Sequence, residues 1–144
     1  MYSQCQLMEL LASHGIRPSV QRIAILDFMF KSHSHPTADE IYSALSAEMP
    51  TLSKTTVYNV LKSFIDAGVA FALNIDDKNA RYDATLCDHA HLKCERCERV
   101  FDLPLSGTFE RVVNGFVINK VHTYYWGVCP ECQLEHNSNQ KEEK

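Results

Sequence analysis

Two short motifs in the second half of the chain each offer a pair of thiolates to one metal ion. They are Cys94-Glu-Arg-Cys97 and Cys129-Pro-Glu-Cys132. Cysteines spaced as CxxC can turn both sulfurs toward the same ion, and two such pairs give four soft ligands in a tetrahedral arrangement. Because no coordination position would stay open, the spacing predicts one structural zinc ion per chain, which stabilises a domain too small to be stable alone. A redox-active CxxC and a rubredoxin-like iron site are the alternatives.

A second group of candidate ligands carries nitrogen and oxygen instead of sulfur. In the segment 88–91, Asp-His-Ala-His, the two imidazoles fall on one side of an extended strand, because side chains alternate along a strand. Asp83, Asp102 and His35 are candidate partners. Mixed nitrogen and carboxylate ligands suit iron(II), manganese(II) or zinc. On spacing alone, a polar surface strand explains the paired histidines equally well.

Recognisable catalytic motifs are missing from the sequence. A zinc deaminase also combines a histidine with a CxxC pair, but it needs a glutamate two residues after the histidine ligand. None of the histidines before the two motifs is followed in this way. A GxSxG nucleophile elbow and a phosphate-binding glycine loop are absent as well. We therefore expect a binding protein and not an enzyme.

The composition is that of an ordinary globular protein, with 45% hydrophobic and 22% charged residues. No apolar run approaches the roughly 20 residues of a membrane helix, and residues 1–11 lack the pattern of a signal peptide. We therefore expect a cytoplasmic protein that does not interact with membranes. In that reducing compartment, six cysteines indicate metal or redox chemistry in place of disulfides. The net charge of -4 argues mildly against nucleic acid, unless basic groups cluster locally.

The first half of the chain has the pattern of a winged helix. Thr37 and Glu40 form a capping box at the start of a helix, and Gly68 is placed to end another. Two β-prone runs joined by a turn-rich segment predict a hairpin. The helices are expected over 3–14, 18–31, 38–49 and 54–68, and the strands over 69–75 and 80–84. In the second half we expect strands over 100–103, 116–121 and 123–129, a short helix over 107–114, and disorder from Gln133 to Lys144.

Several motifs, in this order along nearly the whole chain, resemble those of the ferric uptake regulator family, and most closely its peroxide-responsive branch. They are Arg17-Pro-Ser-Val-Gln-Arg22, His35-Pro-Thr-Ala-Asp-Glu-Ile-Tyr42, Thr56-Val-Tyr-Asn59, Arg81-Tyr-Asp83, Asp88-His-Ala-His91, Val100-Phe-Asp102 and both CxxC pairs. The resemblance implies an α+β fold. A winged helix-turn-helix DNA-binding domain (1–84) would precede a small zinc-stabilised α/β dimerisation and metal-binding domain (85–135) and a polar tail (136–144).

The resemblance also implies a function. It is that of a homodimeric, metal-dependent transcriptional repressor that binds double-stranded DNA at an inverted-repeat operator. In the peroxide-responsive branch, peroxide reacting with bound iron oxidises a ligating histidine, here His89 or His35, and frees oxidative-stress genes. Manganese would repress without sensing peroxide. The alternative within the family is an iron-responsive repressor of metal-homeostasis genes. Outside it, a zinc-binding module for a protein partner and a metal-dependent hydrolase remain alternatives.

Carried over residue by residue, the resemblance assigns two metal ions per chain. The structural zinc positions fall on Cys94, Cys97, Cys129 and Cys132. The regulatory Fe2+ or Mn2+ positions fall on His35, Asp83, His89, His91 and Asp102. An aspartate at position 102, where iron-uptake regulators carry glutamate, favours the peroxide-responsive branch, and the oxygen ligand at position 83 argues against zinc sensing. Ala90 stands where a further site in iron-uptake regulators has an acidic residue, so no third site is expected.

The predicted DNA contacts lie mainly on the polar face of the fourth helix. Hydroxyl and amide groups there could reach base edges, and ammonium groups could reach phosphates, although a solvated helix face is the simpler explanation. The predicted contacts on this face are Lys54, Thr55, Tyr58, Asn59 and Lys62. Arg17 and Arg22 are expected at phosphates, and Lys78 and Arg81 at the adjacent minor groove. Cys5 is expected to be buried and His122 to be structural or exposed, while Cys87 has no assigned role.

Overall fold

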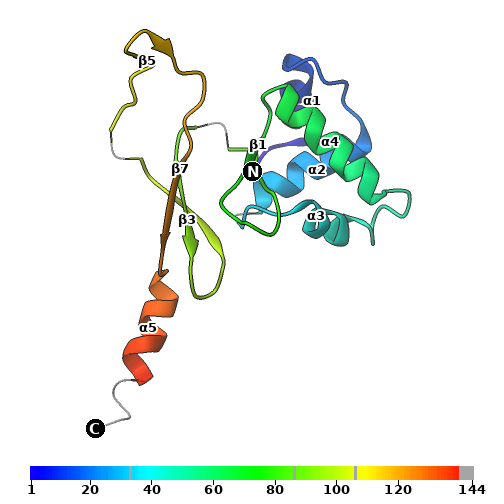
Figure 1. The fold of residues 1–144 in the computed structure, drawn as a ribbon. Helices are drawn as coiled ribbons and strands as arrows, with labels where there is room; N and C mark the ends of the chain where they lie inside the picture. The colour runs from blue at the N-terminus through cyan, green and yellow to red at the C-terminus, as the bar shows by residue number, and fades with distance from the viewer. Residues whose placement is uncertain (33, 86, 106, 140–144) are drawn as a thin grey trace. The chain divides into compact units, whose positions relative to one another are not determined.

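The computed structural model describes residues 1–32, 34–85, 87–105 and 107–139. The chain divides into two compact units, Met1–Cys87 and Asp88–Lys144 (Figure 1). The first contains α1 (Gln4–Ser13), α2 (Val20–Lys31), α3 (Ala38–Leu45), α4 (Lys54–Asp66), β1 (Phe71–Leu73) and β2 (Arg81–Asp83). The second contains β3 (Ala90–Cys94), β4 (Val100–Leu103), β5 (Val112–Val113), β6 (Phe116–Val117), β7 (Thr123–Gly127) and α5 (Pro130–Asn139).

The four helices of the first unit begin at hydroxyl side chains. Ser3, Ser19, Thr37 and Ser53 each accept a hydrogen bond from the amide three residues later, which satisfies a donor that the helix leaves open. The predicted capping box is confirmed, because Glu40 also accepts from the Thr37 amide at 2.7 Å. The helices enclose one apolar core, whose fully buried members include Leu7, Leu11, Ile25, Leu26, Ile41, Val57, Leu61 and Phe64.

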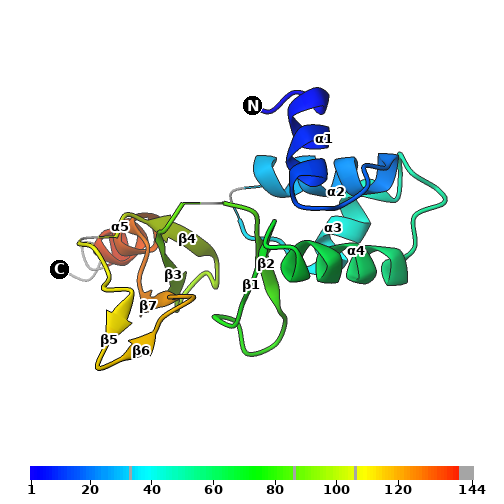
Figure 2. The same ribbon diagram turned by 90° about the horizontal axis from the view of Figure 1, so that it is seen from above.

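The predicted hairpin is confirmed as the antiparallel pair β1–β2, which we call the wing (Figure 2). Backbone interactions connect the wing to the loop before α3. Thr37 forms a β-bridge with Arg81, and the Tyr82 N–H donates to the Pro36 carbonyl at 3.0 Å. This pairing places the loop that carries His35 against the strand that ends at Asp83.

The second unit is built on a three-stranded sheet of order β4–β3–β7. β3 runs antiparallel to β4, with His91 opposite Asp102, and parallel to β7, with Cys94 opposite Gly127. A separate hairpin pairs β5 with β6. None of the helices in the described part of the chain has the length and apolar character needed to span a bilayer.

Two predicted features of the second unit are wrong, and the expected strand over 116–121 is limited to β6. The expected helix over 107–114 is absent from the described residues of that range, which include β5 instead. Asn114 and Gly115 both have positive φ, 49° and 82°, as a tight hairpin turn requires, and Val112 and Val113 favour a strand. The expected disorder after Gln133 is also wrong up to Asn139, because α5 starts directly at the second CxxC motif with proline in its first position. Residues 140–144 lie outside the described residues.

Candidate metal sites and nucleic-acid interface

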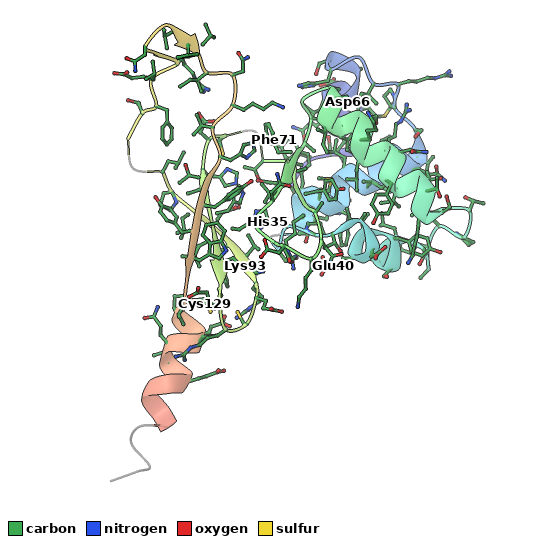
Figure 3. The ribbon with its side chains drawn as sticks, in the orientation of Figure 1. His35, Glu40, Asp66, Phe71, Lys93 and Cys129 are labelled. Carbon is green, nitrogen blue, oxygen red and sulfur yellow. The ribbon has the colours of Figure 1, made fainter. Side chains whose placement is uncertain are left out.

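The pairing of β3 with β7 brings the two CxxC motifs together. Cys94 ends β3 and Cys97 lies in the turn before β4, while Cys129 and Cys132 flank the start of α5, a junction marked in Figure 3. The four sulfur atoms lie within 4.8 Å of one another, and those of Cys97 and Cys129 are 3.8 Å apart. A tetrahedral zinc ion with Zn–S bonds of about 2.3 Å separates its sulfurs by about 3.8 Å. The donor set and its spacing therefore fit zinc.

Hydrogen bonds distribute charge unevenly over these four thiols. The Cys129 amide donates to the Cys94 sulfur at 3.4 Å, and this bond, followed by that of the Cys97 amide, lowers the pKa of Cys94 to about 6. The Arg99 guanidinium, 3.3 Å from the Cys97 sulfur, lowers the pKa of Cys97. The hydrogen bond with Cys129, together with burial, raises the pKa of Cys132 to about 12. Four simultaneous thiolates therefore need the charge of a bound cation.

A second set of candidate ligands lies in the same unit, on β4, on β3 and directly before β3, and we call it the β3–β4 trio. It consists of His89, His91 and Asp102. The Asp102 Oδ1 atom lies 3.1 Å from Nε2 of His89 and 3.5 Å from Nε2 of His91. The imidazole rings are 4.4 Å apart, so both point to one side as the alternation of the strand predicts. Two nitrogens and one carboxylate oxygen are a donor set for iron(II) or manganese(II).

The first unit contains a smaller set, the His35–Asp83 pair. His35 Nε2 lies 3.9 Å from Asp83 Oδ2, and the side chains are only 3% and 7% exposed. His35, in the loop before α3 (Figure 3), has a φ of 53°, in the left-handed region. A buried imidazole beside a buried carboxylate again offers nitrogen and oxygen to a divalent cation.

The polar face of α4 is exposed, as predicted, with Lys54, Thr55, Tyr58, Asn59 and Lys62 all on the surface. Both lysines are engaged by carboxylates. The Lys62 ammonium lies 2.7 Å from Asp66, and that of Lys54 lies 3.5 Å from Asp39. These pairs are solvent-exposed, so phosphates can displace the carboxylates at small energetic cost. The α4 face is therefore available to a polyanion.

The arginines predicted to contact DNA have different surroundings. Arg17 is exposed, and its carbonyl accepts a bond of 2.7 Å from the partly buried Arg22 guanidinium. Arg81 does not point outward from the wing, contrary to the minor-groove prediction. It binds Asp76 at 3.2 Å and the His35 carbonyl at 3.1 Å. Asp76, five positions earlier across the turn of the wing, holds the guanidinium against the hairpin.

The remaining predictions concern single residues outside these sets. Cys5 is exposed on α1, so the expected burial is wrong, because the apolar stripe of that helix is centred on Leu7 and Leu11. His122 is exposed, in agreement with the predicted surface position, with its ring 6.0 Å from that of Tyr124. Cys87 is exposed at the boundary between the units.

A winged helix followed by a small sheet with a four-cysteine zinc site is the architecture of a metal-dependent DNA-binding regulator. The sequence agrees with that class. The model of the ferric uptake regulator family matches residues 13–132, and the chain belongs to this family.

Relatives and solved structures lie within the same family. The chain is 40% identical over 128 residues to the peroxide-responsive repressor PerR of Staphylococcus aureus (strain Mu50 / ATCC 700699), covering 85% of this chain and 86% of that protein. It is 36% identical over 137 residues to the peroxide operon regulator of Bacillus subtilis (strain 168), covering 92% and 94%. A solved structure of PerR from Streptococcus pyogenes is similar with a TM-score of 0.53 and 28% identity, covering 92% and 95%.

Proposed function

We propose that this protein is a cytoplasmic, homodimeric repressor that binds DNA when a regulatory Fe2+ or Mn2+ ion is present and releases it when peroxide oxidises the iron form. The observation that carries the proposal is the placement of the two nitrogen–oxygen ligand sets. Asp83 ends the last strand of the first unit, and His89 begins the trio of the second. Asp83 and His89 are six residues apart, so their Cα atoms can be at most roughly 20 Å apart even when the chain between them is fully extended.

Both sets together would make one site with five ligands, His35, Asp83, His89, His91 and Asp102. An ion held by all five would fix the angle between the DNA-binding unit and the dimerisation unit. A dimer on an inverted repeat places its two reading helices about one turn of DNA apart, ~34 Å. Ligand binding that prefers this arrangement raises DNA affinity by shifting the population toward it.

The proposed sensing step consumes one of the ligands. A bound iron(II) ion would supply the redox chemistry that cleaves the O–O bond of peroxide. One peroxide oxygen would enter a ring C–H bond of His89 or His35, a two-electron oxidation of the imidazole, and the other would leave as water, so the iron would return to its starting oxidation state. The altered ring loses its place as a ligand, so the two units are no longer held in the DNA-binding arrangement. The relatives from S. aureus and B. subtilis are a peroxide-responsive repressor and a peroxide operon regulator, and Asp102 agrees with that branch.

We propose α4 as the recognition helix. Thr55, Tyr58 and Asn59 would face base edges, and Lys54 and Lys62 would face phosphates, which concentrates positive charge on an otherwise acidic chain. Arg17 and Arg22 would contact phosphates at the junction of α1 and α2. The exposure of Lys54, Thr55, Tyr58, Asn59 and Lys62 on one face of α4 supports its proposed role.

The experiment measures retardation of an inverted-repeat operator by the zinc-loaded protein, with Mn2+ or with Fe2+ under anaerobic conditions, before and after hydrogen peroxide. We expect both metals to support binding and peroxide to abolish it only in the iron form. Mass spectrometry should then find one added oxygen on the peptide bearing His89 or on that bearing His35. Iron-dependent binding that survives peroxide with no added oxygen would instead support the iron-responsive alternative. Binding independent of Fe2+ and Mn2+ would contradict both.

A further inference from the structure

Arg81 is the centre of a polar network inside the first unit. Its Nε donates to Oδ2 of Asp76 at 3.2 Å, and its Nη1 donates to the His35 carbonyl at 3.1 Å. The same Nη1 lies 3.5 Å from the Ser34 carbonyl oxygen and 3.8 Å from Oε2 of Glu40. Only 15% of the side chain is exposed. The guanidinium therefore links the turn of the wing to the loop before α3.

The loop that Arg81 contacts has an uncommon backbone conformation. The φ of 53° at His35 lies in the left-handed region, which residues other than glycine rarely occupy. Such a conformation persists only where its surroundings determine it. The Arg81 bond to the His35 carbonyl acts on this peptide directly, and the bond from the Tyr82 amide to Pro36 acts on the next residue.

We propose that Arg81 is a positioning residue of the regulatory metal site, which holds the His35 backbone so that its imidazole stays beside Asp83. This inference rests on the proposed function, because it requires His35 to be a metal ligand. A guanidinium is suited to the task, since its planar fork of five N–H donors can hold two carbonyl oxygens and a carboxylate at once. Asp76 orients the fork through Nε and leaves Nη1 for the loop.

The same network argues against a phosphate-binding role for Arg81. To reach DNA, the guanidinium would have to break its hydrogen bonds with Asp76 and with two backbone carbonyls. The side chain, now only 15% exposed, would also have to move out of its largely buried position. Lys78, at the turn of the same hairpin, is exposed and carries the positive charge that the wing presents to solvent. It provides a matched comparison, because both substitutions remove one positive charge from the hairpin.

The test measures the Mn2+ affinity of the full-length zinc-loaded protein without DNA, by electron paramagnetic resonance of free Mn2+. For Arg81→Gln we expect the dissociation constant to rise roughly 10- to 100-fold, the range seen when a metal ligand loses its supporting partner. For Lys78→Gln we expect a value within about twofold of the unmodified protein, as for an ordinary surface substitution. Arg81→Lys should fall between them, because an ammonium group keeps the charge but lacks the fork.

Two further measurements separate positioning from general destabilisation. In a His35→Ala background, Arg81→Gln should cause no additional loss of Mn2+ affinity, because the effect of Arg81 passes through His35. Hydrogen exchange should become faster at the amides of Ser34, His35 and Thr37, while the core amides of α4 stay protected. Zinc content should stay at one ion per chain.

The outcomes distinguish this inference from the function on which it rests. Unchanged Mn2+ affinity in Arg81→Gln, or an additional loss of equal size in the His35→Ala background, would overturn the positioning role and leave the metal site intact. Mn2+ affinity unchanged by His35→Ala would overturn the proposed site itself, and the role of Arg81 with it. A tenfold or larger loss that disappears in the His35→Ala background supports both.

Discussion

The four-cysteine site and the nitrogen–oxygen ligands differ in how the chain assembles them. The cysteines come in two local pairs within one unit, and the neighbouring strands β3 and β7 bring the pairs together. The proposed nitrogen–oxygen ligands come from the loop before α3, from β2, from β4 and from the start of β3, so this proposed set has members in both units. A closed site with four ligands in one unit stabilises a fold. A site whose ligands were divided between two units, as we propose for the regulatory ion, would be suited to regulation, because its occupancy would depend on how the units are arranged.

Removing the zinc should have the largest effect. Chelation, or Cys94→Ser, should unfold the second unit, since structural zinc contributes on the order of 10 kcal/mol to small domains. The first unit has its own apolar core and should stay folded. Hydrogen exchange of the β3 and α4 amides reports on the two units separately. Cys87→Ser is the control, and protected β3 amides in the zinc-free protein would show that this site is not structural.

Substitution of a nitrogen ligand should abolish regulation without unfolding either unit. For His91→Ala we expect loss of Mn2+-dependent operator binding, with zinc content and dimer formation unchanged. His122→Ala removes an exposed histidine next to β7 and should behave as the unmodified protein does. Gel retardation, metal analysis and analytical ultracentrifugation measure the three properties. If His91→Ala lost the dimer or the zinc, the two kinds of site would not be independent.

Features set by local patterns could be predicted from the sequence, whereas features set by contacts between distant residues could not. CxxC spacing and helix caps are local patterns, so the zinc ligands and the start of α3 could be predicted directly. The inward orientation of Arg81 depends on the pairing of the wing with the loop before α3, which links residues 46 positions apart in sequence. The sequence predicts a helix over 107–114, where the structure has β5, because a two-residue strand is too short to show a periodic pattern.

Removing the cap of α3 should cost a moderate amount of stability. Thr37→Ala deletes the hydroxyl that accepts from the Glu40 amide at 3.2 Å, and we expect unfolding of the first unit to become easier by about 1 kcal/mol. The matched control is Ser43→Ala, at an exposed position inside the same helix. Urea denaturation measures both. If the two variants had the same free energy of unfolding, the Thr37 hydroxyl would not stabilise the start of α3, next to the loop that carries His35.

The smallest effect is expected at the surface of α4. Lys62→Ala should weaken operator binding by less than about tenfold and reduce the slope of log affinity against log salt by about one, as for loss of one phosphate contact. Its pair with Asp66 is exposed, so stability should change by less than about 1 kcal/mol. Lys93→Ala, on β3 of the second unit, is the control. An unchanged salt slope would remove Lys62 from the DNA interface.

Counting the imidazoles on the regulatory ion tests the central claim most directly. Pulsed electron paramagnetic resonance of Mn2+ in protein carrying 15N-labelled histidine resolves nitrogens bound to the ion. We predict signals from His35, His89 and His91 on a single Mn2+ ion, with one signal lost in His35→Ala and one in His91→Ala. A spectrum unaffected by His35→Ala would show that the first unit contributes no histidine to the ion, and would contradict a site shared between the two units.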